Sequence, residues 1–196
     1  LHRVDRRQRQ MCIRDSSFRS LGPHGNQVLA VFLDDFEITG DPDYTVDFSK
    51  EKTEVWPGCQ REISQCTRLK GLWRLEEGCL NGSCSDFGEA YTGAADWTDY
   101  ALECTAIPLL GEHHRVNFRV QGAMRSYAFG LAPEGKLALY KNENGAYREL
   151  ASAPFPWEAG KEYLLKVRVF GQNITADCGG CLLYTSPSPR DQRGSR

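Results

Sequence analysis

The feature that most constrains the fold of this 196-residue chain is the alternation of apolar and polar side chains along many short segments. Apolar residues recur at every second position in residues 100–106, 116–120 and 163–169. This is the period of a β-strand with one buried face, and the spacing of an amphipathic helix is nearly absent. Many short strands separated by turn sequences predict an all-β, antiparallel β-sandwich or jelly roll.

Two short turns predict hairpins between neighbouring strands. Residues 72–75 and 79–83 flank Glu76-Glu77-Gly78, and residues 137–141 and 147–150 flank Asn142-Glu143-Asn144-Gly145. Asn-Gly is a strong local signal for a hairpin, because both residues tolerate the positive φ angles that a tight turn needs. We therefore expect antiparallel pairing across each turn.

The two ends of the chain resemble translated adapter sequence from a sequencing library. Residues 1–16, LHRVDRRQRQMCIRDS, resemble a reading frame through the first tagmentation adapter and its index, and residues 181–196, CLLYTSPSPRDQRGSR, resemble a frame through the second. Two unrelated matches, one at each end, argue against coincidence. We expect both segments to be non-native and exclude them from fold reasoning. Residues 17–180 are then expected to be an internal piece of a longer bacterial gene.

The remaining region divides near residue 40. Residues 41–180 are expected to form a concanavalin-like β-sandwich that is incomplete at its C-terminal end. Residues 17–40 are interpreted either as the first strand of this sandwich or as the closing strand of a preceding module, and Gly40-Asp41-Pro42 as a junction favours the second. A truncated sandwich leaves an open sheet edge, and the apolar residues 182–185 are expected to pair with it.

Charge and hydropathy exclude several classes of partner. The N-terminal segment holds five Arg against two Asp, and the C-terminal segment holds three Arg against one Asp. The whole chain carries −2, so residues 17–180 carry about −7. An acidic domain without Lys/Arg clusters has no electrostatic footprint for nucleic acid. The sequence contains no apolar stretch long enough to predict a membrane span. A cytoplasmic location is favoured, although a signal peptide cannot be sought because the native N-terminus is expected to lie outside the chain.

No metal site is predicted. The six cysteines between residues 17 and 180 form no C-x-x-C pair, and no histidine lies at the spacing of a zinc site. Free structural thiols are favoured over a disulfide framework, since Cys104 lies within an apolar strand pattern. His113 and His114 are adjacent and point in different directions, so we expect an exposed loop there. The six cysteines are Cys59, Cys66, Cys79, Cys84, Cys104 and Cys178.

No catalytic residue is predicted either. Sandwich glycosidases of the laminarinase type use an E-x-D-x-E arrangement on one strand face, and this chain contains no such triple. The nearest acidic cluster is Asp34-Asp35-Phe36-Glu37. Its spacing puts Asp35 and Glu37 on one face without a third partner, so we interpret it as a solvated strand face.

The candidate ligand site is a polar strand face followed by two further residues: Asn117, Arg119 and Gln121, then Arg125 and Tyr127. Amide and guanidinium groups form paired hydrogen bonds with sugar hydroxyls, and an aromatic ring stacks on a pyranose. An additional aromatic platform is expected from Trp97 or Trp73. The alternative is a sheet face that Arg119 merely keeps solvated, which is slightly the commoner arrangement in antiparallel sheets.

Several stretches resemble one bacterial module: YTVDFS at 44–49, GLWRLEEG at 71–78, SDFGEAYTG at 85–93, VNFRVQG at 116–122, SYAFGLAP at 126–133 and LALYKNENG at 137–145. Together they resemble the concanavalin A-like lectin/glucanase sandwich that lies C-terminal to the catalytic domain in some bacterial ADP-ribosylglycohydrolase proteins. The similarity extends from about Val28 to Gly180. Its most specific parts are FRVQ and LYKNENG.

The resemblance implies a parent enzyme that hydrolyses a glycosidic bond to ADP-ribose, with magnesium held in a separate helical domain upstream. It also implies one or two closing strands after Gly180. None of the parent's catalytic or metal-binding residues lies in this chain. The expected function is therefore a non-catalytic accessory module that binds a glycan. The alternatives are a structural spacer or oligomerisation domain and a sandwich-fold glycoside hydrolase.

Overall fold

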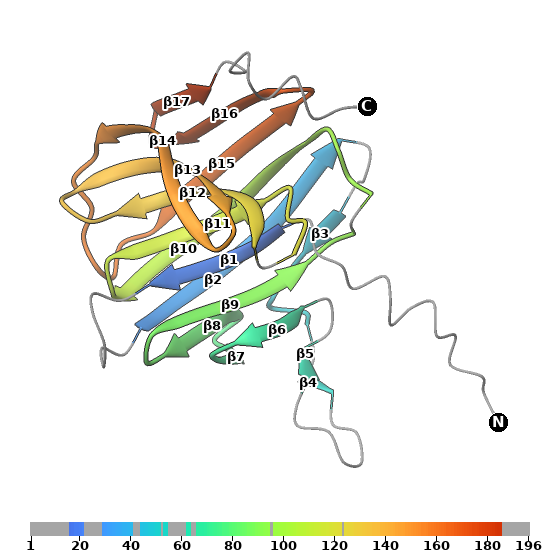
Figure 1. Ribbon diagram of the computed structural model, residues 1–196. Coiled ribbons are helices and arrows are strands. Elements are labelled where there is room, and N and C mark those ends of the chain that lie inside the picture. Colours follow the sequence, from blue (N-terminus) through green and yellow to red (C-terminus); the bar gives the residue numbers. More distant parts are fainter. Residues whose placement is uncertain are drawn as a thin grey trace.

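The computed structural model describes residues 16–21, 29–40, 44–51, 53–54, 62–63, 66–94, 96–122 and 124–185. Within these residues every regular element is a β-strand, and every strand pair is antiparallel. The strands form two large sheets that lie one behind the other (Figure 1). The predicted all-β, antiparallel sandwich is confirmed.

The first sheet has seven strands in the order β14-β13-β12-β11-β1-β9-β6. Strands β11 to β14 are consecutive in sequence and neighbours in space, so hairpins build this half of the sheet. The bounds are β14 (Ala146–Pro154), β13 (Lys136–Glu143), β12 (Arg125–Ala132), β11 (His113–Phe118), β1 (Ser16–Leu21), β9 (Phe87–Thr92) and β6 (Thr67–Lys70).

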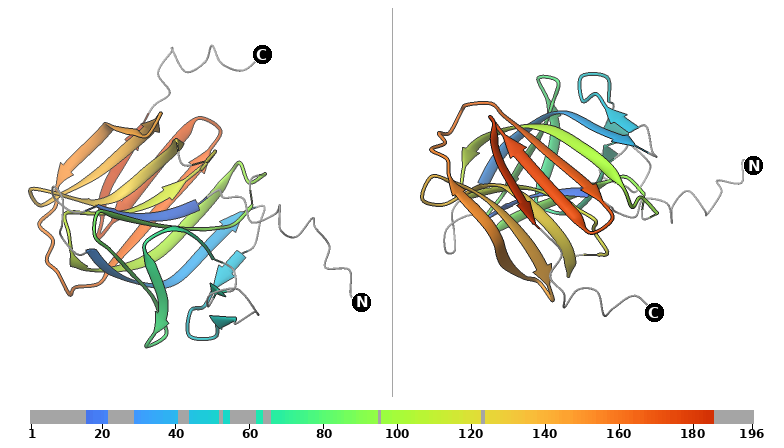
Figure 2. Two further views of the ribbon diagram at one scale, coloured as in Figure 1. Left: turned by 60° about the horizontal axis from the view of Figure 1, so that its bottom comes forward. Right: turned by 90° about the horizontal axis from the view of Figure 1, so that it is seen from above.

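The second sheet has eight strands in the order β17-β16-β15-β10-β2-β8-β7, and Figure 2 shows it against the first from two further sides. A short strand, β3 (Tyr44–Val46), pairs with β2, and β4 (Thr53–Glu54) pairs with β5 (Glu62–Ile63) as a separate ribbon. With β3 counted, the sheet has eight strands, and the bounds of the other seven are β17 (Cys181–Thr185), β16 (Asn173–Cys178), β15 (Tyr163–Phe170), β10 (Tyr100–Leu110), β2 (Leu29–Gly40), β8 (Cys79–Cys84) and β7 (Leu72–Glu76).

The core lies between the two sheets, and the alternating apolar residues supply it. On β11, Val116 and Phe118 are completely buried, and one hydrophobic cluster joins them to Leu102 of β10 and Val167 of β15. Each such side chain contributes roughly 1.5–3 kcal/mol by leaving water. The core faces predicted for β10, β11 and β15 are therefore confirmed.

Both predicted hairpins are present. Glu77 and Gly78 between β7 and β8 have φ angles of 54° and 79°, and Asn144 and Gly145 between β13 and β14 have 57° and 81°. Two consecutive positive φ angles fit the tight turns that match the twist of paired strands.

The N-terminal region, residues 16–40, contributes one strand to each sheet. β1 lies between β11 and β9, and β2 lies between β10 and β8. Both strands thus have neighbours on either side within the sandwich. The module boundary near residue 40 stays a prediction.

The C-terminal edge behaves as expected. β17 pairs with β16 through residues 181–185. Leu182 and Tyr184 are 59% and 68% exposed, whereas Leu183 between them is 6% exposed. The expected pairing of residues 182–185 is therefore present, with β16 as the partner strand, and the non-native origin of these residues stays a prediction. The expectations for residues 1–15 and 186–196 lie outside the described residues.

The adjacent histidines do not lie in an exposed loop. Both belong to β11, and their side chains occupy opposite faces of the first sheet: the His113 ring packs edge-on against Tyr140, and the His114 ring against Trp157. Burial lowers the pKa of His113 to about 3 and the pKa of His114 to about 4. The expectation of a loop was wrong because it weighed Gly111 above the strand pattern that follows it.

The acidic cluster on β2 is interrupted by a bulge. Cys104 of β10 pairs with Phe36 and Thr105 pairs with Asp34, so the register passes over Asp35. A bulge breaks the strict alternation of side chains. The shared face that spacing predicted for Asp35 and Glu37 therefore does not follow from the register.

Candidate functional site

The predicted polar strand face is divided at Arg119. Strand β11 ends at Phe118, and Arg119 has a φ of 49°, in the left-handed region that non-glycine residues seldom adopt. Asn117 keeps its place on the outer face of the first sheet, opposite to the core residues Val116 and Phe118. Arg119 is redirected, so alternation no longer links it to Asn117.

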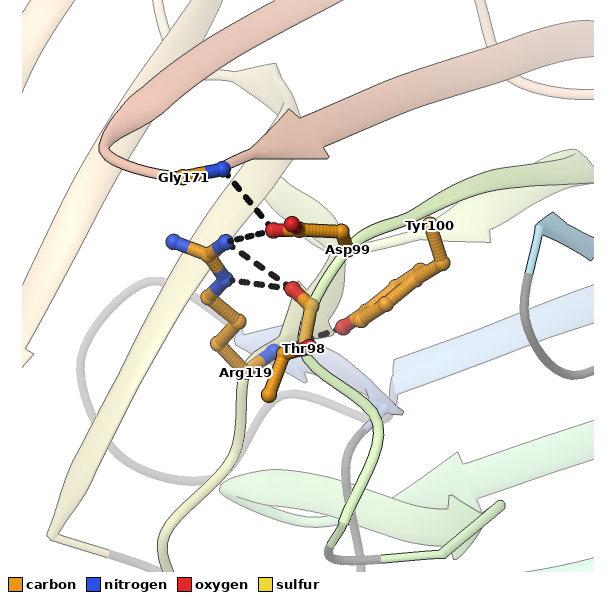
Figure 3. A network of polar contacts seen from close by, with 5 residues as sticks. All are labelled: Thr98, Asp99, Tyr100, Arg119 and Gly171. Carbon is orange, nitrogen blue, oxygen red and sulfur yellow. Dashed lines mark hydrogen bonds and ion pairs between the residues drawn. The ribbon is translucent and has the colours of Figure 1, made fainter.

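Arg119 joins three loops at one end of the sandwich (Figure 3). Its Nε and Nη2 atoms donate to the carbonyl oxygen of Thr98 at 3.1 and 2.9 Å, and Nη2 also lies 3.2 Å from Asp99 Oδ1. The same Asp99 oxygen accepts a hydrogen bond from the backbone N–H of Gly171, in the β15–β16 turn. The backbone N–H of Arg119 donates to the Tyr100 hydroxyl at 2.9 Å. These bonds hold Arg119 in its unusual conformation.

A polar pocket of about 420 Å³ opens beside this network. It contains four of the six ligand-binding residues predicted from the sequence. The residues that line it are Arg119, Gln121, Arg125, Ser126, Tyr127, Lys141, Asn142, Glu143 and Asn144.

The start of β12 and the end of β13 form the main wall of the polar pocket. Arg125 pairs with Glu143, and Tyr127 pairs with Lys141, so these four side chains share one sheet face. It is the inner face, since the Tyr127 ring stacks on the core residue Phe118 at 5.9 Å. The pocket is thus where charged residues replace apolar ones at the end of the inner face.

Backbone hydrogen bonds fix the rim of the polar pocket. The N–H of Gln121 donates to the carbonyl of Arg125 at 2.8 Å, and the N–H of Asn144 donates to the carbonyl of Met124 at 2.8 Å. The two loops at the mouth are therefore tied to each other. A site whose walls are already ordered loses less entropy when a ligand binds.

Asn117 lies in a different polar region. Its side chain is completely buried, and its Nδ2 donates to Glu89 Oε1 of β9 at 3.0 Å, across the intervening strand β1. On the same face of β11, the buried Arg115 guanidinium lies 4.3 Å from the Tyr140 ring centre and 4.9 Å from that of Tyr147. We call Glu89, Arg115, Asn117, Tyr140 and Tyr147 the buried polar layer.

Neither tryptophan lines the polar pocket. Trp97 is half-buried and packs against Tyr44 and Tyr100, with ring centres 5.2 and 6.3 Å away. Trp73 is 3% exposed, and its Nε1 donates to the carbonyl of Lys70. The structure therefore places Trp97 at the core edge and Trp73 in the core. Their aromatic character alone could not distinguish a sugar platform from core packing.

Sequence reasoning missed Lys141, Glu143 and Asn144 as pocket residues. The Asn142–Gly145 signal marked them as part of a hairpin turn, and only the pairing of β12 with β13 brings them next to Arg125. It also missed Glu89 and Arg115, because their partners lie on other strands.

The lining of the polar pocket is rich in hydrogen-bonding groups, but its composition is poor for hydrolysis or metal binding. Guanidinium, amide and ammonium groups dominate its walls, and Glu143 is the one carboxylate among its lining residues. The described residues contain no group of three His, Cys, Asp or Glu side chains that could hold a metal ion.

The thiols and the search for membrane spans add little to the site. Cys66, Cys84, Cys104, Cys178 and Cys181 are free thiols, whereas Cys59 lies outside the described residues. Burial raises the pKa of the Cys104 thiol to about 12.

In the described part of the chain, no helix has the length and apolarity to cross a membrane.

Comparison with known proteins gives no assignment. Neither the family models, nor the curated proteins, nor the solved structures include one that matches this chain.

Proposed function

We propose that this chain is a non-catalytic accessory β-sandwich that binds carbohydrate through the polar pocket. In this proposal it is a concanavalin-like jelly roll that follows the catalytic domain of a larger bacterial protein of the ADP-ribosylglycohydrolase type. Magnesium and catalysis belong to that upstream domain.

One observation carries the carbohydrate proposal. Arg119, Gln121, Arg125 and Tyr127, selected from the sequence for their hydrogen-bonding geometry, line one cavity together with Asn144. Its volume of about 420 Å³ lies in the range of small-molecule sites. Planar donors and acceptors at fixed positions suit the directed hydroxyl groups of a sugar ring.

Carboxylate chemistry supports binding over hydrolysis. A retaining glycosidase needs two carboxyl groups about 5–5.5 Å apart, and an inverting enzyme needs them about 6.5–9.5 Å apart. Among the residues that line the polar pocket, Glu143 has no carboxylate partner, and its Oε1 is 3.1 Å from Lys141 Nζ. The sandwich-glycosidase alternative therefore has less support than binding.

The test is a glycan array probed with the full 196-residue chain and two pocket variants. Arg125→Ala and Gln121→Ala each remove an exposed hydrogen-bonding side chain and should weaken binding of any retained glycan about tenfold. Arg168→Ala is the matched control, because Arg168 is exposed on β15 away from the pocket lining.

Arg119→Ala and Tyr127→Ala are poorer probes, since Arg119 holds the loops and Tyr127 packs on Phe118. Circular dichroism should show that the chosen variants keep their strand content. A chain that retains no glycan across a broad array would contradict the proposal and favour a structural spacer. Turnover of a glycoside by the chain would favour the hydrolase instead.

A further inference from the structure

The walls of the polar pocket carry an excess of positive charge. Three cationic side chains, Arg119, Arg125 and Lys141, line it together with the single carboxylate of Glu143. Asp99 lies outside the lining but 3.2 Å from Arg119, and it offsets part of this charge. One unit of positive charge remains after both carboxylates are counted.

That remaining charge belongs to Arg125. Arg119 is bonded to Thr98 and Asp99, and Lys141 is 3.1 Å from Glu143. Arg125 is exposed at the mouth and forms no ion pair with any described residue. Its backbone is held by the bond between its carbonyl and the N–H of Gln121.

The positive charge of the polar pocket contrasts with the net charge of the chain. The chain as a whole carries −2 at neutral pH, so a cationic pocket is not a consequence of overall composition. Charge of one sign inside a concave surface attracts ligands of the opposite sign, because the protein walls focus the field. A guanidinium also binds a planar oxyanion through two parallel hydrogen bonds.

We infer that the ligand of the polar pocket is an acidic saccharide, whose anionic group pairs with Arg125 while its hydroxyls bond to Gln121 and Asn144. This inference rests on the proposed carbohydrate-binding function. The anionic group is a carboxylate, as in a hexuronate, or a sulfate ester, and the two share the oxyanion geometry that a guanidinium recognises. The partly buried Tyr127 ring offers an apolar surface for the pyranose.

The experiment is isothermal titration calorimetry of the 196-residue chain with four small saccharide probes. They are methyl glucuronoside, its neutral methyl ester, methyl glucoside and glucose 6-sulfate. The glucuronoside or the sulfate should bind about tenfold more tightly than the ester and the glucoside. Arg125→Ala should abolish that preference, and Arg168→Ala should preserve it. Raising salt from about 20 to about 200 mM should weaken the acidic probe more than the neutral ones.

The outcomes separate this inference from the function on which it rests. Equal binding of the glucuronoside, its ester and the glucoside would overturn the acidic ligand and leave carbohydrate binding in place. Preference for the acidic probes that survives Arg125→Ala would also overturn it. Binding of none of the four probes, by a chain that retains a neutral glycan on the array, would overturn the acidic ligand alone. No retention of any glycan would remove the proposed function as well.

Discussion

Two polar regions meet at the end of β11, where Asn117 and Arg119 lie two residues apart, and they differ in burial and in hydrogen-bond partners. Asn117 belongs to the buried polar layer, where it is completely buried and bonded to Glu89. Arg119 belongs to the polar pocket, where its side chain is 22% exposed and its Nη1 donates none of the hydrogen bonds drawn in Figure 3. Similar planar polar groups are therefore structural on one side and, in our proposal, bind a ligand on the other.

This difference indicates that solvent access, more than residue type, decides whether a polar side chain stabilises the fold or remains available to a ligand. In the buried polar layer, a lost partner leaves a donor or acceptor without water to replace it. In the polar pocket, water replaces a lost side chain at small cost to folding. Substitutions in the layer should therefore change stability, and substitutions in the pocket should change ligand affinity.

The largest expected effect comes from Glu89→Ala. The substitution removes the acceptor of the buried Asn117 amide, and it should lower the free energy of unfolding by about 2–3 kcal/mol. Urea denaturation measures this change. Glu89→Gln keeps an acceptor oxygen and should fall between the two proteins. Glu158→Ala, at an exposed ion pair with Lys161, is the control and should change stability much less. Equal midpoints for Glu89→Ala and Glu158→Ala would contradict the distinction.

The second expected effect is a loss of stability in mild acid. Burial holds the pKa of His114 near 4, against 6.5 for an ordinary histidine, so between these values the unfolded chain binds more protons than the folded one. The stabilisation is complete above pH 6.5 and is lost as the pH falls. By about pH 5 the completely buried His114 alone should cost roughly 2 kcal/mol.

Urea midpoints between pH 7.5 and 5 measure this loss, and NMR titration of the imidazole signals measures the pKa of His113 and His114 directly. The walls of the polar pocket contain no histidine, so His113 and His114, which lie outside it, are the described histidines that can produce the trend. Stability that stays constant from pH 6.5 to 5, or a His114 pKa near 6.5, would show that these rings are not desolvated.

The smallest expected effect comes from Asp99→Ala, in the network that supports the pocket. The change removes one of the two acceptors of Arg119 Nη2, leaving the Thr98 carbonyl, and it removes the side-chain acceptor of the Gly171 N–H. Because the Asp99 side chain is 41% exposed, water screens part of this loss, and about 1 kcal/mol of stability is expected to disappear. Asp96→Ala, an exposed aspartate on the same loop, is the control. If both variants unfolded at the same urea concentration, Arg119 would not depend on Asp99.

The strands of the core could be predicted because their signal is local. Leu102, Val116 and Val167 belong to short runs in which every second residue is apolar, and each is buried as that pattern predicts. The same pattern failed at Arg119, since nothing in the neighbouring letters indicates a positive φ. That conformation depends on Tyr100 and Thr98, which other parts of the chain bring to it.

Half of the candidate site followed from residue chemistry, and the other half needed strand register. Gln121 and Arg125 were found from their hydrogen-bonding groups. Glu143 and Asn144 lie beside them only because β12 pairs with β13. Asn117 lies outside the pocket, where it bonds to Glu89 on β9. The central places of β1 and β2 were likewise decided by pairing with distant strands.

The amino-acid sequence by itself determined that this protein is made of antiparallel strands with one apolar face, where its tight hairpins turn, and which polar residues were candidates for a ligand site. The tertiary structure decided which of those polar residues meet in one cavity and which are sealed beneath neighbouring side chains. The physical reason is range: alternation and turn conformation depend on adjacent residues, whereas burial and hydrogen-bond partners depend on which strands the whole chain brings side by side.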